Sequence, residues 1–311
     1  MPAPKTSVLL ALLCAAGIAA SQSIPGRSAF RLDADAARFS GADSLTYVEI
    51  YYGVSEASLS YLPDATGYRG ALEMKLQIAD STRIVASRQW VLPRILRDTA
   101  DLRAAKNILS FESLALPDGN YRLSLSCRDS VDPSRTDSVL IPLRIAGFAM
   151  RGVALSDVEL CSRITPSADR SSPFYRNTLE IIPNPSRLYG EGLPVIHFYA
   201  EVYNLNMSTG PNVLLRASIL DTYGKEVAFQ AKSKPRTHQS SAEYGSMNVA
   251  SLPGGSYLFR VALLDTTVQP HRALATSEKK FFVYNRNIGK GDDPARASQH
   301  DQMFSFMTET D

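Results

Sequence analysis

The sequence has 311 residues, of which 33 are Lys or Arg, 31 are Asp or Glu and 44% are hydrophobic. This is the composition of an ordinary globular protein, which excludes a disordered or collagen-like chain, and the length suggests about two domains. Because a net charge of +2 creates no strong positive field, no nucleic acid is expected among the partners. The 3 Cys and 4 His leave little material for a metal cluster.

The N-terminus has the pattern of an export signal. Lys5 precedes an apolar stretch at 8–20, which has the length of a signal-peptide core and is too short to span a bilayer. Small residues allow cleavage after Ala19 or after Ser21. We therefore expect 1–21 to be a signal peptide and the mature chain to be exported to the periplasm, the cell surface or the medium, with no transmembrane segment.

Apolar residues recur with a period of two through the first half of the chain. Val48, Ile50 and Tyr52 alternate with other residues, and the apolar residues of 72–78 do the same. Such alternation is typical of antiparallel strands with one buried face. The segment 94–107 departs from it, and its loose helical spacing predicts a loop or short helix that covers one end of the first domain.

An internal repeat determines the predicted architecture. Residues 110–121 align without a gap on 246–257, with the same residue at five of the twelve positions. Each copy is read as a strand that ends in Leu, a Pro-x-Gly turn, and a new strand that begins with Tyr121 or Tyr257. Pro and Gly suit the turn, and a Tyr at this place resembles the tyrosine corner of β-sandwiches.

The repeat predicts an all-β chain of two tandem immunoglobulin-like or fibronectin-like β-sandwiches after the signal peptide. The first domain is predicted at 28–148 and the second at 151–285. Since no Gly/Ser-rich linker separates them, we expect them to be closely docked. Residues 286–311 have the composition of a linker and tail.

Four blocks follow one another in a distinctive order: Phe-Arg-Leu-Asp-Ala-Asp at 30–35, Leu-Ser-Asp-Val-Glu-Leu at 155–160, Pro-Asn-Pro-Ser-Arg-Leu-Tyr-Gly at 183–190 and Phe-Tyr-Ala-Glu-Val-Tyr-Asn-Leu at 198–205. Together they resemble the N-terminal region of GWxTD-domain proteins, which are exported bacterial proteins. The GWxTD motif itself is missing, because the only tryptophan, Trp90, is followed by Val91. The resemblance implies the sandwich region of a shortened or truncated family member.

The cysteines allow two further predictions. Acylation of Cys14 would make a lipoprotein, but Leu13 stands where a small residue is expected. Cys127 and Cys161 remain after the signal peptide is removed, when the net charge falls to +1 through the loss of one lysine. Strand alternation turns Cys127 inward and places Cys161 on a face with acidic residues. We expect a buried and an exposed thiol, both free, rather than a disulfide.

No pattern in the sequence predicts a metal or cofactor site. Asp33 and Asp35 near Asp43 could suggest calcium, but the alternating oxygen ligands of a calcium loop are absent, and a solvated strand is expected. The histidines lack zinc spacing; they are His197, His238, His271 and His300.

Catalytic patterns are also absent. The chain has no Gly-x-Ser-x-Gly elbow, and its Gly pair at 254–255 lacks the Lys-Ser/Thr of a phosphate loop. Glu49 and Glu201 lie in aromatic strands, where paired-acid glycosidase chemistry is conceivable, although the repeat explains them as sheet-face residues. The segment 183–186 is expected to be a rigid turn. We predict no catalytic, cofactor-binding or metal-binding residues.

The predicted function is therefore that of a non-enzymatic structural or interaction module of the bacterial cell envelope that binds a protein partner or another envelope component. Its binding surfaces would be exposed strand edges or the aromatic faces around Tyr51, Tyr199 and Tyr203, although core packing is expected for some of these rings. The alternative is a carbohydrate-binding or enzyme-associated accessory module. A basic cluster in a predicted hairpin loop offers a polysaccharide or acidic protein a contact; it contains Lys232, Lys234, Arg236 and His238.

Overall fold

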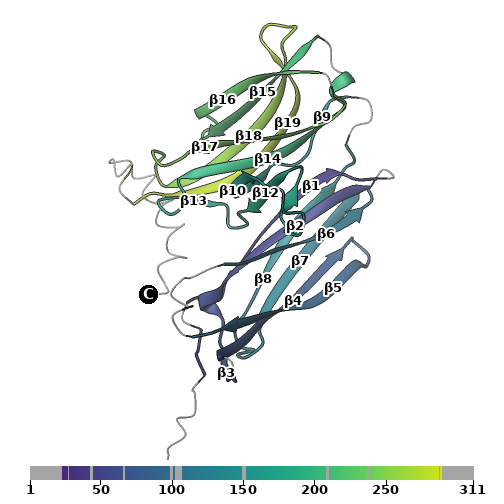
Figure 1. Ribbon diagram of the computed structural model, residues 1–311. Helices are drawn as coiled ribbons and strands as arrows, with labels where there is room; N and C mark the ends of the chain where they lie inside the picture. The colour runs from purple at the N-terminus through teal and green to yellow at the C-terminus, as the bar shows by residue number, and fades with distance from the viewer. Residues whose placement is uncertain are drawn as a thin grey trace, which may run out of the picture.

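The computed structural model describes residues 23–26, 28–42, 45–65, 67–98, 101, 107–148, 152–207, 210–236, 238–286 and 288. The predicted signal peptide and nearly all of the predicted tail lie outside these ranges. Within them the chain consists of strands, turns and short 3-10 turns such as η1 (Glu56–Ser58) and η3 (Leu205–Met207). The predicted all-β fold of two tandem β-sandwiches is confirmed (Figure 1).

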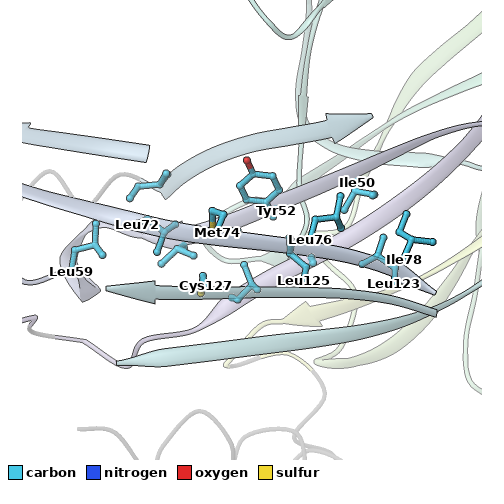
Figure 2. Packing of buried hydrophobic residues seen from close by; sticks show 14 of the residues in the cluster. Ile50, Tyr52, Leu59, Leu72, Met74, Leu76, Ile78, Leu123, Leu125 and Cys127 are labelled. Carbon is cyan, nitrogen blue, oxygen red and sulfur yellow. The ribbon is translucent and has the colours of Figure 1, made fainter. Parts of the chain in front are cut away.

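The first sandwich packs a three-stranded sheet against a larger one. Alternating apolar residues of β4 and β7 point to the space between the sheets, where Leu72, Met74 and Leu125 are almost fully buried (Figure 2). The strands of the first sheet, in spatial order, are β1 (Leu32–Ser40), β2 (Thr46–Ser55) and β6 (Asn107–Leu116). Those of the second are β5 (Ile84–Leu96), β4 (Gly67–Ala79), β7 (Gly119–Asp129) and β8 (Thr136–Ile145), with β3 (Leu62–Asp64) beside the start of β4.

The second sandwich repeats this arrangement with added strands. Its core contains Phe198, Phe259 and Phe281, whose rings pack between the sheets. One sheet orders β11 (Tyr175–Arg176), β12 (Leu179–Pro183), β10 (Glu159–Pro166), β14 (Val195–Tyr203) and β17 (Ser241–Asn248), and β9 (Ala154–Leu155) also pairs with β14. The other orders β13 (Leu188–Gly190), β19 (Arg272–Tyr284), β18 (Gly255–Asp265), β15 (Asn212–Leu220) and β16 (Glu226–Pro235).

The two repeated tyrosines occupy equivalent places. Each is the third residue of its strand, Tyr121 in β7 and Tyr257 in β18. The Tyr121 hydroxyl donates a hydrogen bond to the Pro117 carbonyl (3.2 Å), and the Tyr257 hydroxyl donates one to the Pro253 carbonyl (2.9 Å). The tyrosine part of the repeat prediction is therefore confirmed.

The strand before each turn does not follow the gapless alignment. In the first copy β6 runs to Leu116, directly before the turn, but in the second β17 ends at Asn248, well before Leu252. The prediction that both copies end this strand in Leu is wrong for the second copy. Residues 249–252 form a turn in which the Leu252 amide donates to the Val249 carbonyl. Leu252 packs on the core from outside the strand.

The start of the predicted loop or helix at 94–107 is a strand. β5 continues to Leu96, with Arg94 paired opposite Gly70 and Ile95 opposite Arg69. The prediction fails there because β5 goes on pairing with β4 beyond the end of its own alternating apolar residues. Residues 102–106 lie outside the described part of the chain.

A third apolar cluster joins the sandwiches. It contains Ala37, Phe39 and Tyr51 from the outer face of the first sheet, and Cys161, Leu179, Ile181 and Tyr199 from the outer face of β10, β12 and β14. Close docking, as predicted, follows from this shared core.

This third cluster also corrects the prediction for Cys161. Its side chain is fully buried rather than exposed, because the first sandwich covers the face on which it lies. Cys127 is buried in the core of the first sandwich. Both thiols are free, as predicted, but they are kept apart by lying in different cores rather than by a difference in exposure.

Candidate functional site

The strongest concentration of buried charge lies between the sandwiches, and Arg176 stands at its centre. The hairpin of β11 and β12 positions it: Arg176 pairs with Leu179, and only Asn177 and Thr178 separate them. Both turn residues have positive φ, 50° and 64°, which is the conformation of a tight type I′ turn. The Asn177 amide donates to the Tyr199 hydroxyl at 2.8 Å and so fixes the turn against β14.

The Arg176 guanidinium contacts an acid from each sandwich. It donates to Glu49 of β2 and lies 3.5 Å from a carboxylate oxygen of Glu159 of β10. Its central carbon also lies 4.9 Å from the ring centroid of Phe39 and 5.1 Å from that of Tyr199. One cation therefore bridges two carboxylates and two aromatic faces across the interface. We call Arg176, Glu49, Glu159 and Tyr51 the Arg176 cluster.

Burial dominates the electrostatics of this cluster. It raises the pKa of Glu159 to about 7, an effect that Arg176 opposes and the charge of Glu49 reinforces. Burial, together with the charges of Glu159 and Glu49, also raises the pKa of Tyr51 well above its usual value. Tyr51 is thus held as a neutral phenol that donates to Glu49 at 2.5 Å.

The space beside the Arg176 cluster is small. A cavity of about 20 Å³ is lined by Glu49, Glu159 and Arg176 together with neighbouring aromatic residues. A volume of this size holds about one water molecule and no sugar ring. Although Glu159 has a pKa suited to proton transfer, the arrangement gives a substrate no room beside the two acids.

Further polar contacts lock the same interface. The Arg38 guanidinium donates two hydrogen bonds of 2.8 Å to the Asp157 carboxylate, and the Asp157 amide donates to the Arg38 carbonyl at 3.0 Å. Lys279, on the last strand, donates to Asp35 at 2.9 Å and to the Ala36 carbonyl at 2.7 Å. The interface is therefore held by residues of the first and last described strands, β1 and β19.

Several residues that the sequence offered as possible ligands or binding surfaces have structural roles. Asp35 is buried against Lys279 and is not part of a solvated strand, while Asp33 pairs with Arg31. Asp43 lies outside the described residues. Tyr51 and Tyr199 have the core packing expected for some of the aromatic rings and offer no binding face, because they are 2% and 0% exposed inside the interface.

Glu201 and Tyr203 form a second network at the same interface. Glu201 accepts hydrogen bonds from the hydroxyls of Tyr199 (2.8 Å) and Tyr203 (2.7 Å). The Ser40 amide of the first sandwich donates to the Tyr203 hydroxyl at 3.0 Å. Glu201 is therefore the sheet-face residue that the repeat predicted, and Glu49 is a buried member of the Arg176 cluster.

The basic cluster lies only partly in the predicted loop: Arg236 and His238 are in the connection between β16 and β17, but the two lysines are not. Lys232 and Lys234 lie in strand β16, and both pair with Glu243 of β17, which is fully buried. Arg236 donates to the main-chain carbonyls of a neighbouring turn, including that of Leu205 at 2.9 Å. The sequence could not show this because Glu243 and the turn belong to other segments of the chain.

The remaining polar residues have ordinary surroundings. His197 is partly buried on β14, where burial lowers its pKa, and His238 and His271 are exposed, while His300 lies outside the described residues. The segment 183–186 is the predicted turn, since the Ser186 hydroxyl donates to the Asn184 side chain at 2.7 Å. Within the described ranges no three His, Cys, Asp or Glu side chains gather as metal ligands.

The second sandwich contains a pocket that the sequence did not predict. The pocket has a volume of about 160 Å³ and opens between β16 and β17, above Phe198, Leu215 and Ala217, with Lys232 and Tyr244 at its rim. Two polar residues on the inward face of β16 are the signal that could have indicated it; they are Gln230 and Lys232. In the described part of the chain no helix is long and apolar enough to cross a membrane.

Comparisons with known proteins give a distant likeness in fold. No protein-family model and no curated protein sequence matches the chain. A solved β-glucuronidase from Parabacteroides merdae is similar at 12% identity with a TM-score of 0.22, over 76% of this chain and 28% of that one. A putative β-galactosidase from Bacteroides fragilis has 9% identity and a TM-score of 0.23, over 75% of this chain and 32% of that one.

A third solved structure, dimeric latent PorU from Porphyromonas gingivalis, has 12% identity and a TM-score of 0.26, over 83% of this chain and 20% of that one. The chain thus spans about a fifth to a third of the length of these three proteins. Their names describe whole proteins, and the likeness does not transfer an activity to this chain.

Proposed function

We propose that the protein is an exported, non-enzymatic interaction module of the bacterial cell envelope, which binds a protein partner along an open sheet edge. The N-terminal signal pattern and the resemblance to GWxTD-domain proteins support the location. The enclosed Arg176 cluster supports a structural role for the buried acids, because Glu49 and Glu159 hold the sandwiches together and face a cavity with room for about one water.

The observation that carries the proposal is the free edge of β5. Among the described strands β5 pairs only with β4, so thirteen residues present one unpaired side of their backbone. Val91 and Ile95 on this strand are 56% and 65% exposed. A long edge strand with exposed apolar side chains is a template on which a partner strand adds by main-chain hydrogen bonds.

The test is a capture experiment with the mature protein as bait in an envelope extract. The Val91→Lys/Ile95→Lys double variant places charges beside the edge and is expected to lose a partner that the natural protein retains. Met207→Lys, which changes an exposed apolar residue of the second sandwich, is the matched control and is expected to retain it. Equal capture by all three proteins, or no specific capture, would overturn the proposal.

A carbohydrate-binding module is the second candidate function. Tyr223 and Phe229, in the turn and the second strand of the β15–β16 hairpin, are 76% and 58% exposed, and Arg216 lies over the Phe229 ring. Exposed aromatic rings of this kind can stack on sugars. Binding on a glycan array that is lost in Tyr223→Ala and Phe229→Ala variants would favour this candidate, and the absence of glycan binding would reject it.

A further inference from the structure

The pocket between β16 and β17 lies between two strand edges that are both unpaired. Among the described strands β16 pairs only with β15, and β17 pairs only with β14. The floor is apolar and comes from Phe198, Leu215 and Ala217, while Lys232 stands at the rim. The second sandwich therefore has a pocket that reaches its core at this side, beside the ion pairs by which Lys232 and Lys234 cross to Glu243.

The first sandwich shows what normally fills this place. Counting six residues from the equivalent tyrosines leads to Cys127 in β7 and Leu263 in β18. Cys127 pairs with Met74 of β4, and Met74 in turn pairs with Trp90 of β5. Leu263 pairs with Leu215 of β15, which pairs with Lys232 of β16. Lys232 therefore occupies the position of Trp90.

Trp90 closes the first sandwich. Its indole N–H donates to the Tyr52 hydroxyl at 3.1 Å, and the two ring centroids are 5.8 Å apart. Arg88 of β5 also bridges to Glu112 of β6 at 2.8 Å, across the same gap. Trp90 packs on the hydrophobic core together with other residues of its strand.

The second sandwich lacks both members of this pair. Lys232 replaces Trp90, and Ala200 stands at the position of Tyr52 in the aligned strands 50–54 and 198–202. The pocket of about 160 Å³ lies beside Lys232, where the first sandwich has the Trp90 ring. A cavity of roughly 150 Å³ with apolar walls is known to accept a benzene ring, so this pocket has the size of one aromatic side chain.

Charged groups beside the pocket define the chemistry of an occupant. Glu243, fully buried, forms ion pairs with both Lys232, whose Nζ lies 3.3 Å from its Oε2 atom, and Lys234. Two lysines against one glutamate leave one excess positive charge at the rim, which favours a carboxylate on the occupant.

We propose that this groove binds an extended segment of a partner protein, which pairs with the free edge of β16 and inserts a tryptophan or tyrosine side chain into the pocket, with an acidic residue beside Lys232. The inference rests on the proposed function, for which it names a second site and the chemistry of the partner segment. It is independent of the β5 edge in the other sandwich.

The test uses the mature full-length protein and a synthetic nine-residue peptide, rich in Thr and Val, with one tryptophan next to one aspartate. Calorimetry measures affinity, and amide chemical shifts of Gly245 and Lys232 report the location. We expect binding that weakens at least tenfold when the peptide tryptophan becomes alanine, and that also weakens when its aspartate becomes lysine.

Variants of the protein test the pocket directly. Lys232→Trp restores the residue type that closes the first sandwich and is expected to weaken binding at least tenfold while leaving the fold intact. Ala217→Leu fills the floor from β15 and is expected to act in the same direction. Lys225→Trp, in the exposed turn before β16, is the matched control and is expected to bind as the natural protein does. Thermal unfolding of each variant checks that it folds.

Several outcomes would overturn the inference. The first two are the absence of peptide binding and equal binding of the alanine peptide. The third is unchanged peptide binding by the folded Lys232→Trp variant. In that case the inward lysines would serve only to discourage the addition of a strand. Shifts of the same amides with methyl pyranosides but not with peptides would assign the groove to a sugar. If capture of an envelope protein still depends on Val91 and Ile95, the proposed function stands although this inference fails.

Discussion

At the scale of single residues, Arg176 shows how one side chain can serve two domains. Its guanidinium has enough donors for two carboxylates, and its flat faces lie near the rings of Phe39 and Tyr199. Removing it would leave Glu49 and Glu159 buried without a cation, and breaking a buried pair in this way costs about 3–5 kcal/mol. The cluster is thus a structural requirement of the interface.

The raised pKa of Glu159 predicts a pH dependence of stability. Its folded-state pKa of about 7 lies above the ordinary value of 4.5, so the folded state binds the proton more tightly than the unfolded state. The resulting stabilisation is fully present below pH 4.5 and is lost as the pH rises to 7, by on the order of 3 kcal/mol. The free energy of unfolding of the natural protein should therefore decrease over this range.

Glu159→Gln should remove that part of the decrease, which denaturant unfolding at several pH values from 4.5 to 8 would measure. Glu278→Gln changes an exposed glutamate of β19 and is the matched control. If the stability of Glu159→Gln and of the natural protein followed parallel curves over this pH range, the raised pKa would be wrong.

At the scale of elements, the sequence indicated most of what lies within one sandwich. Alternation identified strands such as β4, and the Pro-x-Gly-x-Tyr pattern located the starts of β7 and β18, because turn and strand chemistry depend on neighbouring residues. The end of β17 could not be predicted in this way. Its length depends on pairing with β14, from Val195 opposite Asn248 to Val202 opposite Ser241, and this partner is distant in sequence.

The tyrosine corners predict a difference between the two copies. Replacing either tyrosine by phenylalanine removes one hydrogen bond and keeps the ring, at a cost of about 1 kcal/mol. Tyr257→Phe should cost more than Tyr121→Phe, because Tyr257 is buried and its bond is shorter. Chemical denaturation measures both, with exposed Tyr223→Phe as the control. An equal or larger loss in Tyr121→Phe would contradict this ranking.

At the scale of the whole molecule, the two sandwiches act as one body because their outer faces share a core. Sequence reasoning predicted close docking from the missing linker, yet it placed Cys161, with the acidic residues beside it, on an exposed face. The reason is physical: alternation reports which side of a strand a residue occupies, but a second domain decides whether the outer side meets water. The same limit hid the partners of Lys232 and Asp35.

Separating the domains should therefore expose an apolar surface that promotes self-association. A fragment of residues 23–148 would present Ala37, Phe39 and Tyr51 to water, and exposed apolar patches of this kind promote association. Sedimentation of the fragment is expected to show self-association that a Phe39→Ser/Tyr51→Ser variant of the same fragment reduces. A monomeric fragment that unfolds at the same temperature as the full-length protein would show that the third core contributes little.

The bond from Lys279 to Asp35 joins residues 244 positions apart, and this separation matters for the order in which the protein is made. Synthesis proceeds from the N-terminus, so the first sandwich is complete while the strands that cover its outer face are still unmade. Phe39 and Tyr51 then remain uncovered until β10, β12 and β14 have emerged, and Lys279 binds β1 only after β19 has been made. During that interval the nascent chain needs protection from misassociation, which a holding chaperone can supply.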